Sequence, residues 1–173
     1  MTDLIDFESN LRQLKDFQQR VLLVPAQWRA FVPAEPLAWD RVRFTPENKA
    51  GVPAQRGIYA FVVQFQDDRE APLALPTHGY VMYAGITGEK AEDRTLFDRY
   101  GDYVRDQRRP KRMSIWSMLN KWKDDMFFHF APVSPNFDLG AAETALNDAI
   151  IPPYVTNDFS AEVRQLVRVL RAN

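Results

Sequence analysis

The chain has 173 residues, of which 46% are apolar and 26% are charged, a composition typical of a single globular domain. It contains no cysteine, which excludes disulfide bonds, thiolate metal sites and a cysteine nucleophile, and its two histidines argue against a multi-histidine zinc site. The 22 basic and 23 acidic side chains nearly balance, and this balance argues against a general nucleic-acid coating protein.

Neither a membrane-spanning segment nor a secretory signal is visible in the sequence. No apolar run approaches the ~20 residues that a membrane-spanning helix needs. The first residues are acidic and lack the basic-then-apolar order of a secretory signal. We therefore expect a cytoplasmic protein with no membrane partner.

The first predicted element is an amphipathic helix over residues 3–23. Its apolar residues fall at helical spacing: Leu4, Phe7, Leu11, Leu14 and Val21. Such a helix packs on the main domain or forms the seam of a homodimer, and the pattern leaves both interpretations open. Residues 24–56 contain five prolines, so we expect an irregular segment there. We therefore divide the chain into an N-terminal extension, residues 1–55, and a main domain, residues 56–173.

The main domain contains predicted strands and helices. Three segments rich in β-branched and aromatic residues are predicted strands: residues 57–65, 80–86 and 126–133. Four helices are predicted: residues 95–108, residues 114–123, residues 139–151 capped by Asp138, and a last helix that begins after Asn157 or Asp158 and ends near Arg171. This order indicates an α+β fold around a small, mostly antiparallel sheet.

Basic residues concentrate in the middle of the chain. Between residues 99 and 123 only Asp102 and Asp106 oppose eight basic side chains: Arg99, Arg105, Arg108, Arg109, Lys111, Arg112, Lys121 and Lys123. This stretch therefore carries a charge of +6, although the whole chain carries −1. It forms either a solvated basic face or a surface that binds a polyanion, and the charges alone leave both interpretations open.

A few residues elsewhere have types that suit phosphate chemistry. Glu143 lies in an alanine-rich helical segment, where small neighbours allow close approach to another element, and its carboxylate suits a hard cation such as Mg²⁺. A plain surface glutamate near a helix start is the simpler interpretation of this residue. Tyr59 and Tyr83 lie on two predicted strands, where tyrosines commonly only pack. Gly57 and Gly85 beside them indicate a bulge or a close approach of another group.

Five short motifs then occur in an order that is found in one enzyme family. The first two are Gly57-Ile58-Tyr59 and Tyr83-Ala84-Gly85, the latter followed by Ile86-Thr87. The third combines Leu96, Arg99 and Tyr103 at intervals of three and four residues. The last two are Glu143 with Pro152 nine residues later, and Asn157. Over residues 56–157 this series resembles the GIY-YIG nuclease superfamily.

The chain departs from the family pattern at three points. Ala84 stands where the second motif usually has isoleucine. The loop between Gly85 and Arg99 is longer than usual, so Arg94 competes with Arg99 for the arginine position. Asn157 follows Pro152 by five residues instead of three, which leaves the role of this asparagine open.

The resemblance implies a three-stranded antiparallel sheet flanked by helices and a single divalent metal ion, Mg²⁺ or Mn²⁺, bound by Glu143. It implies that Arg99 holds the scissile phosphate, and that Tyr59 acts as general base or aligns the attacking water although its reference pKa is about 10. Tyr83 and Tyr103 would position this water or contact phosphate. The implied substrate-binding residues are Gly85, Arg105, Arg108, Arg109, Lys111, Arg112 and Asn157.

We therefore expect a metal-dependent endonuclease of restriction, phage or defence type that binds and hydrolyses DNA. The alternative is a catalytically inactive nucleic-acid-binding module on the same fold. A third hypothesis is a protein-interaction subunit that binds its partner through the N-terminal helix and the proline-rich segment.

Overall fold

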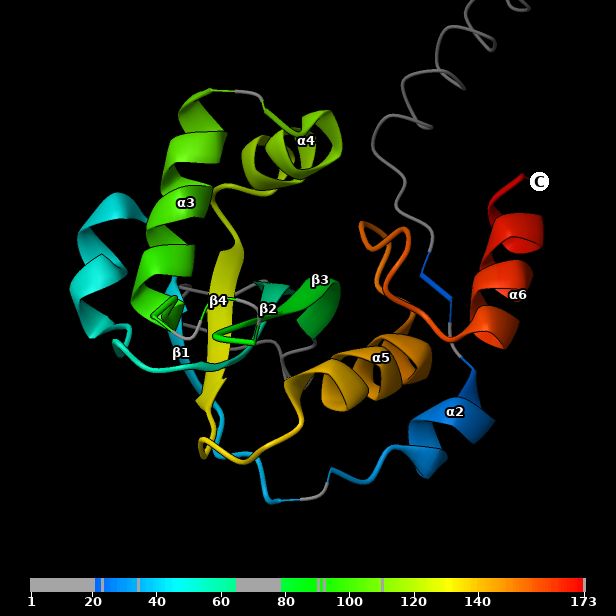
Figure 1. Ribbon diagram of the computed structural model, residues 1–173. Coiled ribbons are helices and arrows are strands. Elements are labelled where there is room, and N and C mark those ends of the chain that lie inside the picture. The colour runs from blue at the N-terminus through cyan, green and yellow to red at the C-terminus, as the bar shows by residue number, and fades with distance from the viewer. Residues whose placement is uncertain are drawn as a thin grey trace, which may run out of the picture.

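The computed structural model describes residues 21–172, apart from residues 23, 34, 65–78, 90, 92 and 110. The predicted amphipathic helix over residues 3–23 lies almost entirely outside this part of the chain. The described part is an α+β fold, as the order of elements predicts, and its centre is an antiparallel sheet (Figure 1).

The sheet has four strands among the described residues, so the expectation of three is wrong. In spatial order the strands are β1 (Asp40–Arg43), β4 (Met126–Pro132), β2 (Gly57–Gln64) and β3 (Gly79–Thr87). The additional strand, β1, lies in the proline-rich segment that was expected to be irregular. It escaped prediction because its four residues are mostly charged and exposed and show no apolar alternation. It pairs with β4 at the edge of the sheet, where a polar strand is tolerated.

Helices cover both faces of the sheet. Their bounds are Pro25–Ala30 for α2, Leu96–Arg108 for α3, Met113–Lys121 for α4, Leu139–Ile150 for α5 and Ala161–Ala172 for α6, and a 3₁₀ helix, η1, spans Pro46–Gly51. The central strand β2 is buried on both faces. Tyr59 and Phe61 pack toward α3 and α4, whereas Ile58 and Ala60 pack toward α5 (Figure 1). Alternate residues of one strand therefore serve two cores.

Two caps fix where the important helices begin. Thr95 caps α3, because its hydroxyl accepts from the Asp98 N–H at 3.2 Å while the Asp98 carboxylate accepts from the Thr95 N–H at 3.1 Å. Asp138 caps α5 as predicted, accepting from the Ala141 N–H at 2.9 Å. The cap of α3 sets the face on which Arg99 and Tyr103 lie, since residues four apart share one side of a helix.

Among the residues that the structure describes, no helix is long and apolar enough to cross a membrane.

Tyr100 connects the segment around β1 to α3. Its side chain is 0% exposed, and its hydroxyl donates to the Thr45 carbonyl at 2.6 Å and accepts from the Thr45 N–H at 3.0 Å. This hydroxyl therefore joins residues of the predicted extension to the main domain.

Tyr100→Phe is expected to lower the free energy of unfolding by about 1–2 kcal/mol, because the partly buried Thr45 carbonyl loses its donor. Urea unfolding measures the change. Tyr80→Phe is the matched control, since Tyr80 is 46% exposed, and it should change the value by no more than about 0.5 kcal/mol. Equal stability of the Tyr100→Phe variant and the unmodified chain would contradict the proposed connection.

Candidate functional site

Tyrosines from three elements meet on the α3 side of the sheet. Tyr59 of β2 pairs with Gly85 of β3, which places Tyr83 diagonally across from it on the same face. The ring centroids of Tyr59 and Tyr83 are 6.4 Å apart, and that of Tyr103 on α3 lies 5.7 Å from Tyr59. Gly85 makes this arrangement feasible, because a Cβ atom there would lie 2.6 Å from the Tyr59 hydroxyl oxygen. The sequence could not fix this strand register, and the structure shows that the two tyrosines share a face.

Arg99 is attached to this cluster by a direct hydrogen bond. Its Nε donates to the Tyr59 hydroxyl oxygen at 3.0 Å, and this hydroxyl lies 2.9 Å from that of Tyr103. The guanidinium carbon of Arg99 is also 5.5 Å from the centroid of the Tyr103 ring, a distance typical of a cation–π contact. The side chain of Arg99 is 31% exposed, so the buried hydroxyl of Tyr59 holds a guanidinium that reaches solvent.

Burial keeps the tyrosines of the cluster neutral. Tyr59 and Tyr103 are 0% exposed, and desolvation, followed by the neighbouring phenols, raises the pKa of both well above the ordinary value. Burial and the adjacent Tyr103 also raise the pKa of Tyr83, although this residue is only partly buried. Of the three phenols, Tyr83 is therefore the one that solvent can approach.

Both candidate arginines converge on one carboxylate. Arg94 and Arg105 form ion pairs with Asp102, and a terminal nitrogen of Arg99 lies 4.0 Å from it. Of the two arginines that compete for the family position, Arg99 contacts the tyrosines, whereas Arg94 pairs with Asp102. The geometry therefore favours Arg99 for the central position.

Glu143 approaches the same region from α5. Its carboxylate is partly buried and interacts with the backbone N–H of Ile86 in β3. Desolvation raises the pKa of Glu143 to about 7, and the charges of Asp158 and Glu89 add to this effect, while the positive charge of Arg99 opposes it. The charge of Glu143 therefore interacts with that of Arg99.

The donor set around Glu143 suits only a weakly chelated cation. Within the described residues, no group of three or more histidine, aspartate and glutamate side chains could hold a metal ion. Mg²⁺ is commonly bound by one or two carboxylates and completes its shell with water and substrate phosphate. Glu143 is a half-buried carboxylate with the negative charges of Asp158 and Glu89 near it, and such a group can bind a cation that keeps most of its water ligands. Glu143 is therefore compatible with the predicted Mg²⁺ or Mn²⁺.

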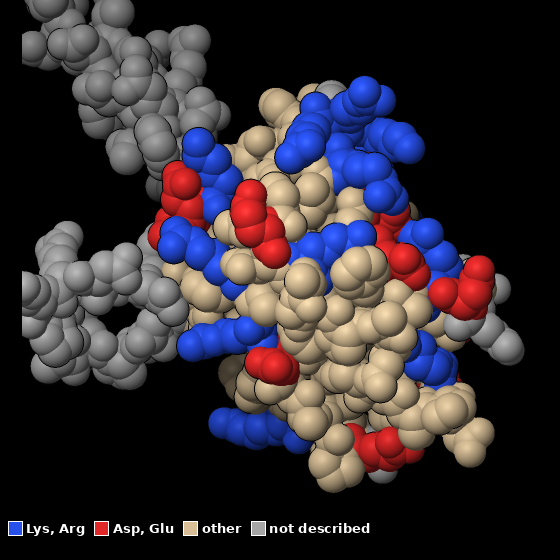
Figure 2. Space-filling model, turned by 90° about the vertical axis from the view of Figure 1, so that its left-hand side faces the viewer, with Lys and Arg blue, Asp and Glu red and all other residues tan. Residues whose placement is uncertain are grey.

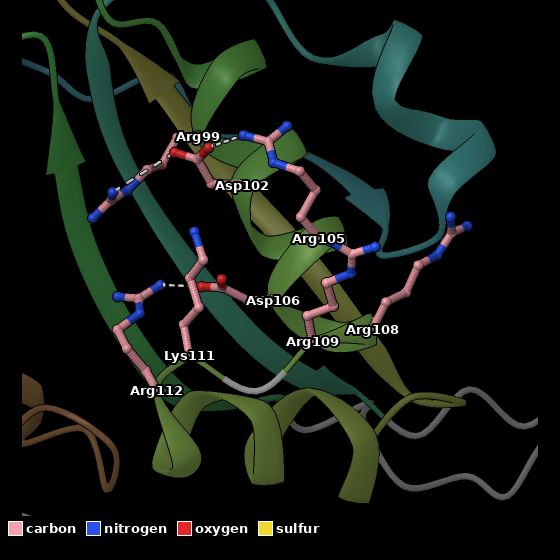
Figure 3. Close-up of a pocket in the computed structure, with 8 residues that line it drawn as sticks. All are labelled: Arg99, Asp102, Arg105, Asp106, Arg108, Arg109, Lys111 and Arg112. Atoms are coloured by element: carbon pink, nitrogen blue, oxygen red, sulfur yellow. Dashed lines mark hydrogen bonds and ion pairs between the residues drawn. The ribbon is translucent and has the colours of Figure 1, made fainter.

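A hollow of about 680 Å³ opens beside Arg99, and we call it the basic hollow. It is lined by Arg99, Asp102, Arg105, Asp106, Arg108, Arg109, Lys111 and Arg112 (Figure 3). The five predicted substrate-binding residues of the basic stretch, which are four arginines and one lysine, therefore line the same hollow as Arg99. Figure 2 shows Lys and Arg side chains gathered at the end of the molecule where α3 runs into α4. Asn157 lies apart from the residues that line the hollow, exposed in the connection between α5 and α6.

Sequence reasoning missed the two aspartates that organise the hollow. Asp102 and Asp106 appeared only as charges that oppose the basic stretch, but each is an ion-pair partner of arginine. Arg99, Asp102 and Arg105 are spaced three residues apart on a predicted helix. Residues at this spacing are neighbours on the helix surface, so the sequence could have predicted that Asp102 pairs with these arginines. The pair between Asp106 and Arg112 crosses a turn between two helices, and its spacing carries no such signal.

Comparisons of the chain with protein-family models, with curated proteins and with solved structures find no match. The resemblance to GIY-YIG nucleases therefore remains a hypothesis that depends on the motif residues. The contacts among Tyr59, Arg99 and Tyr103 do not depend on this resemblance.

The raised pKa of Glu143 predicts a pH effect on stability. The folded chain binds the proton of this carboxyl more tightly than the unfolded chain, whose glutamates titrate near 4.3, so its contribution to stability is lost as the pH rises from about 4.5 to about 7. Glu143→Gln removes this loss. Relative to the unmodified chain, the variant should gain about 1 kcal/mol between pH 5 and pH 8, a value reduced for screening by solvent.

Urea unfolding at several pH values between 5 and 8 measures this difference. Glu162→Gln is the control, since it removes the same charge from an exposed position on α6 and should show no pH-dependent gain. A Glu143→Gln curve that runs parallel to that of the unmodified chain would contradict the assigned environment.

Proposed function

We propose that this chain is a metal-dependent endonuclease that hydrolyses DNA phosphodiester bonds. The observation that carries the proposal is the position of Arg99: a buried tyrosine holds it through a 3.0 Å hydrogen bond at the rim of the basic hollow, within electrostatic range of Glu143. A fixed guanidinium and a carboxylate that can hold a divalent cation are groups that stabilise the charge that develops in phosphodiester hydrolysis.

Arg99 is suited to bind the scissile phosphate. Its Nε is engaged by Tyr59, so the terminal nitrogens are the ones that can face an anion. These nitrogens match two phosphate oxygens and stay protonated at any physiological pH. Because the arginine is held before the substrate arrives, its charge can act on the transition state without reorganisation.

The environment of Tyr59 favours a positioning role over a role as general base. A base must lose its proton near neutral pH, and burial acts against this loss at Tyr59 and Tyr103. The two hydroxyls instead hold Arg99 and each other. Tyr83, which is partly exposed, is better placed to contact a water molecule or a phosphate oxygen.

Glu143 would hold the divalent cation. A bound Mg²⁺ or Mn²⁺ supplies Lewis-acid stabilisation of negative charge on the phosphate. The contribution of the chain is a partly buried carboxylate that interacts with the Ile86 backbone and with the charge of Arg99. This carboxylate binds cations best when it is ionised, so metal binding should strengthen as the pH rises through about 7.

Arg99→Gln is expected to lower the rate of DNA cleavage at least about 100-fold, because it removes a donor that faces the developing charge. The assay is conversion of supercoiled plasmid, and separately of single-stranded DNA, in the presence of Mg²⁺ or Mn²⁺. Arg94→Gln is the matched control: it removes the same charge from the neighbouring arginine of Asp102, and it should change the rate by less than about tenfold. Cleavage by Arg99→Gln at the unmodified rate would overturn the assignment.

The second candidate function is a nucleic-acid-binding module without catalytic activity. The displaced Asn157 and the buried, neutral tyrosines favour it. It predicts that the unmodified chain retards DNA in a gel and leaves it uncut with either metal ion. Glu143→Ala should retard DNA without cutting it under either proposal, so the result that separates them is whether the unmodified chain cuts DNA that Glu143→Ala leaves intact.

A further inference from the structure

Arg112 shares its aromatic partner with Arg99. It lies in the connection between α3 and α4, directly before Met113, and its guanidinium carbon is 5.1 Å from the centroid of the Tyr103 ring. The corresponding distance for Arg99 is 5.5 Å, to the same ring. Two cations from different segments therefore gather around one buried phenol, although like charges repel. Such an arrangement suggests that the two arginines have a common anionic ligand.

Each of these arginines is held in place by a partner of its own. Arg112 donates to the Asp106 carboxylate at 2.8 Å, and Asp106 is 9% exposed. Arg99 donates to Tyr59 and faces Asp102. A guanidinium has five N–H donors, so one partner leaves others for a ligand. Arginines that are fixed in this way lose little conformational entropy when they bind.

The two aspartates that the arginines face lie one helical turn apart. Asp102 and Asp106 are four residues apart on α3, which corresponds to about 6 Å along the helix axis. Neighbouring phosphates of one nucleic-acid strand have a comparable separation. Figure 3 shows Arg99 beside Asp102 and Arg112 beside Asp106, both on the same side of the basic hollow. The side chain of Arg112 is 40% exposed, so a ligand in the hollow can reach it.

We propose that Arg112 binds the phosphate adjacent to the one bound by Arg99, so that the basic hollow holds two consecutive phosphates of one strand along α3. This inference rests on the proposed function, because it takes the ligand to be a nucleic acid. In this arrangement Asp106 positions Arg112, and the nucleic-acid strand runs along α3 where it crosses the hollow.

A pair of trinucleotides tests the inference directly. One is d(TpTpT), with two charged phosphodiesters, and the other has the same bases but a neutral methylphosphonate in place of one linkage. Their affinities are measured by calorimetry at low salt and without divalent metal, so that nothing is cleaved. The unmodified chain should bind the doubly charged ligand at least about tenfold more tightly, because hydrogen bonds to charged groups are strong.

Arg112→Gln should reduce this ratio to about twofold or less. Because the variant leaves Asp106 buried without its partner, the double variant Asp106→Asn/Arg112→Gln is measured as well. It keeps the net charge of the hollow unchanged and should lose the preference in the same way. Lys123→Gln is the charge control: it removes one positive charge from an exposed position that does not line the hollow, and it should keep the preference.

Three results would overturn the inference: an unmodified chain that binds both ligands equally, a preference that survives in both Arg112 variants, or an equal loss in Lys123→Gln. Failure of plasmid cleavage with the ligand preference intact would instead reject the nuclease proposal and leave the two-phosphate site standing.

Discussion

The hydrogen bond from Arg99 Nε to the hydroxyl of Tyr59 is the interaction on which the site depends. It joins the central strand of the sheet to α3, and it uses a phenol that is 0% exposed. A buried hydroxyl without a partner is costly, so Tyr59, Tyr103 and Arg99 stabilise one another as a unit. Gly85 belongs to this constraint, because any larger residue in the paired position of β3 would displace the Tyr59 ring. The glycine and the tyrosine of the two motifs are therefore linked by packing as well as by any role in chemistry.

Glu143 reaches the site because β3 is an edge strand. Among the described residues, no strand pairs with the outer side of β3, and residues after β4 contact its backbone there: the Met82 carbonyl accepts from the Tyr154 N–H at 3.0 Å, and Ile86 interacts with Glu143. These contacts cover the edge, which would otherwise be open to another chain. Of the two contacts, the one with Ile86 involves the carboxylate of Glu143 itself. One set of contacts thus protects the sheet and orients a candidate metal ligand.

Local signals in the sequence predicted much of this fold, and long-range contacts limited the rest. Strands β2, β3 and β4 have dense β-branched and aromatic residues, and Thr95 and Asp138 mark helix starts, so these elements could be predicted. The four residues of β1 depend on pairing with β4, which no local pattern shows. For the site, motif spacing predicted the residues. It could not show that Tyr59 would be buried and bonded to Arg99, because this depends on strand register and on how α3 packs.

Under the proposed function, the two aspartates of the basic hollow explain how a chain with a net charge of −1 could bind a polyanion. Asp102 and Asp106 weaken the positive field of the hollow, which lowers nonspecific attraction at long range. They also hold arginines in defined positions, which improves binding at contact. A ligand with phosphates at the matching separation then gains from both arginines, whereas a ligand with a different spacing gains from only one. Positioned arginines therefore favour selection by geometry over selection by total charge.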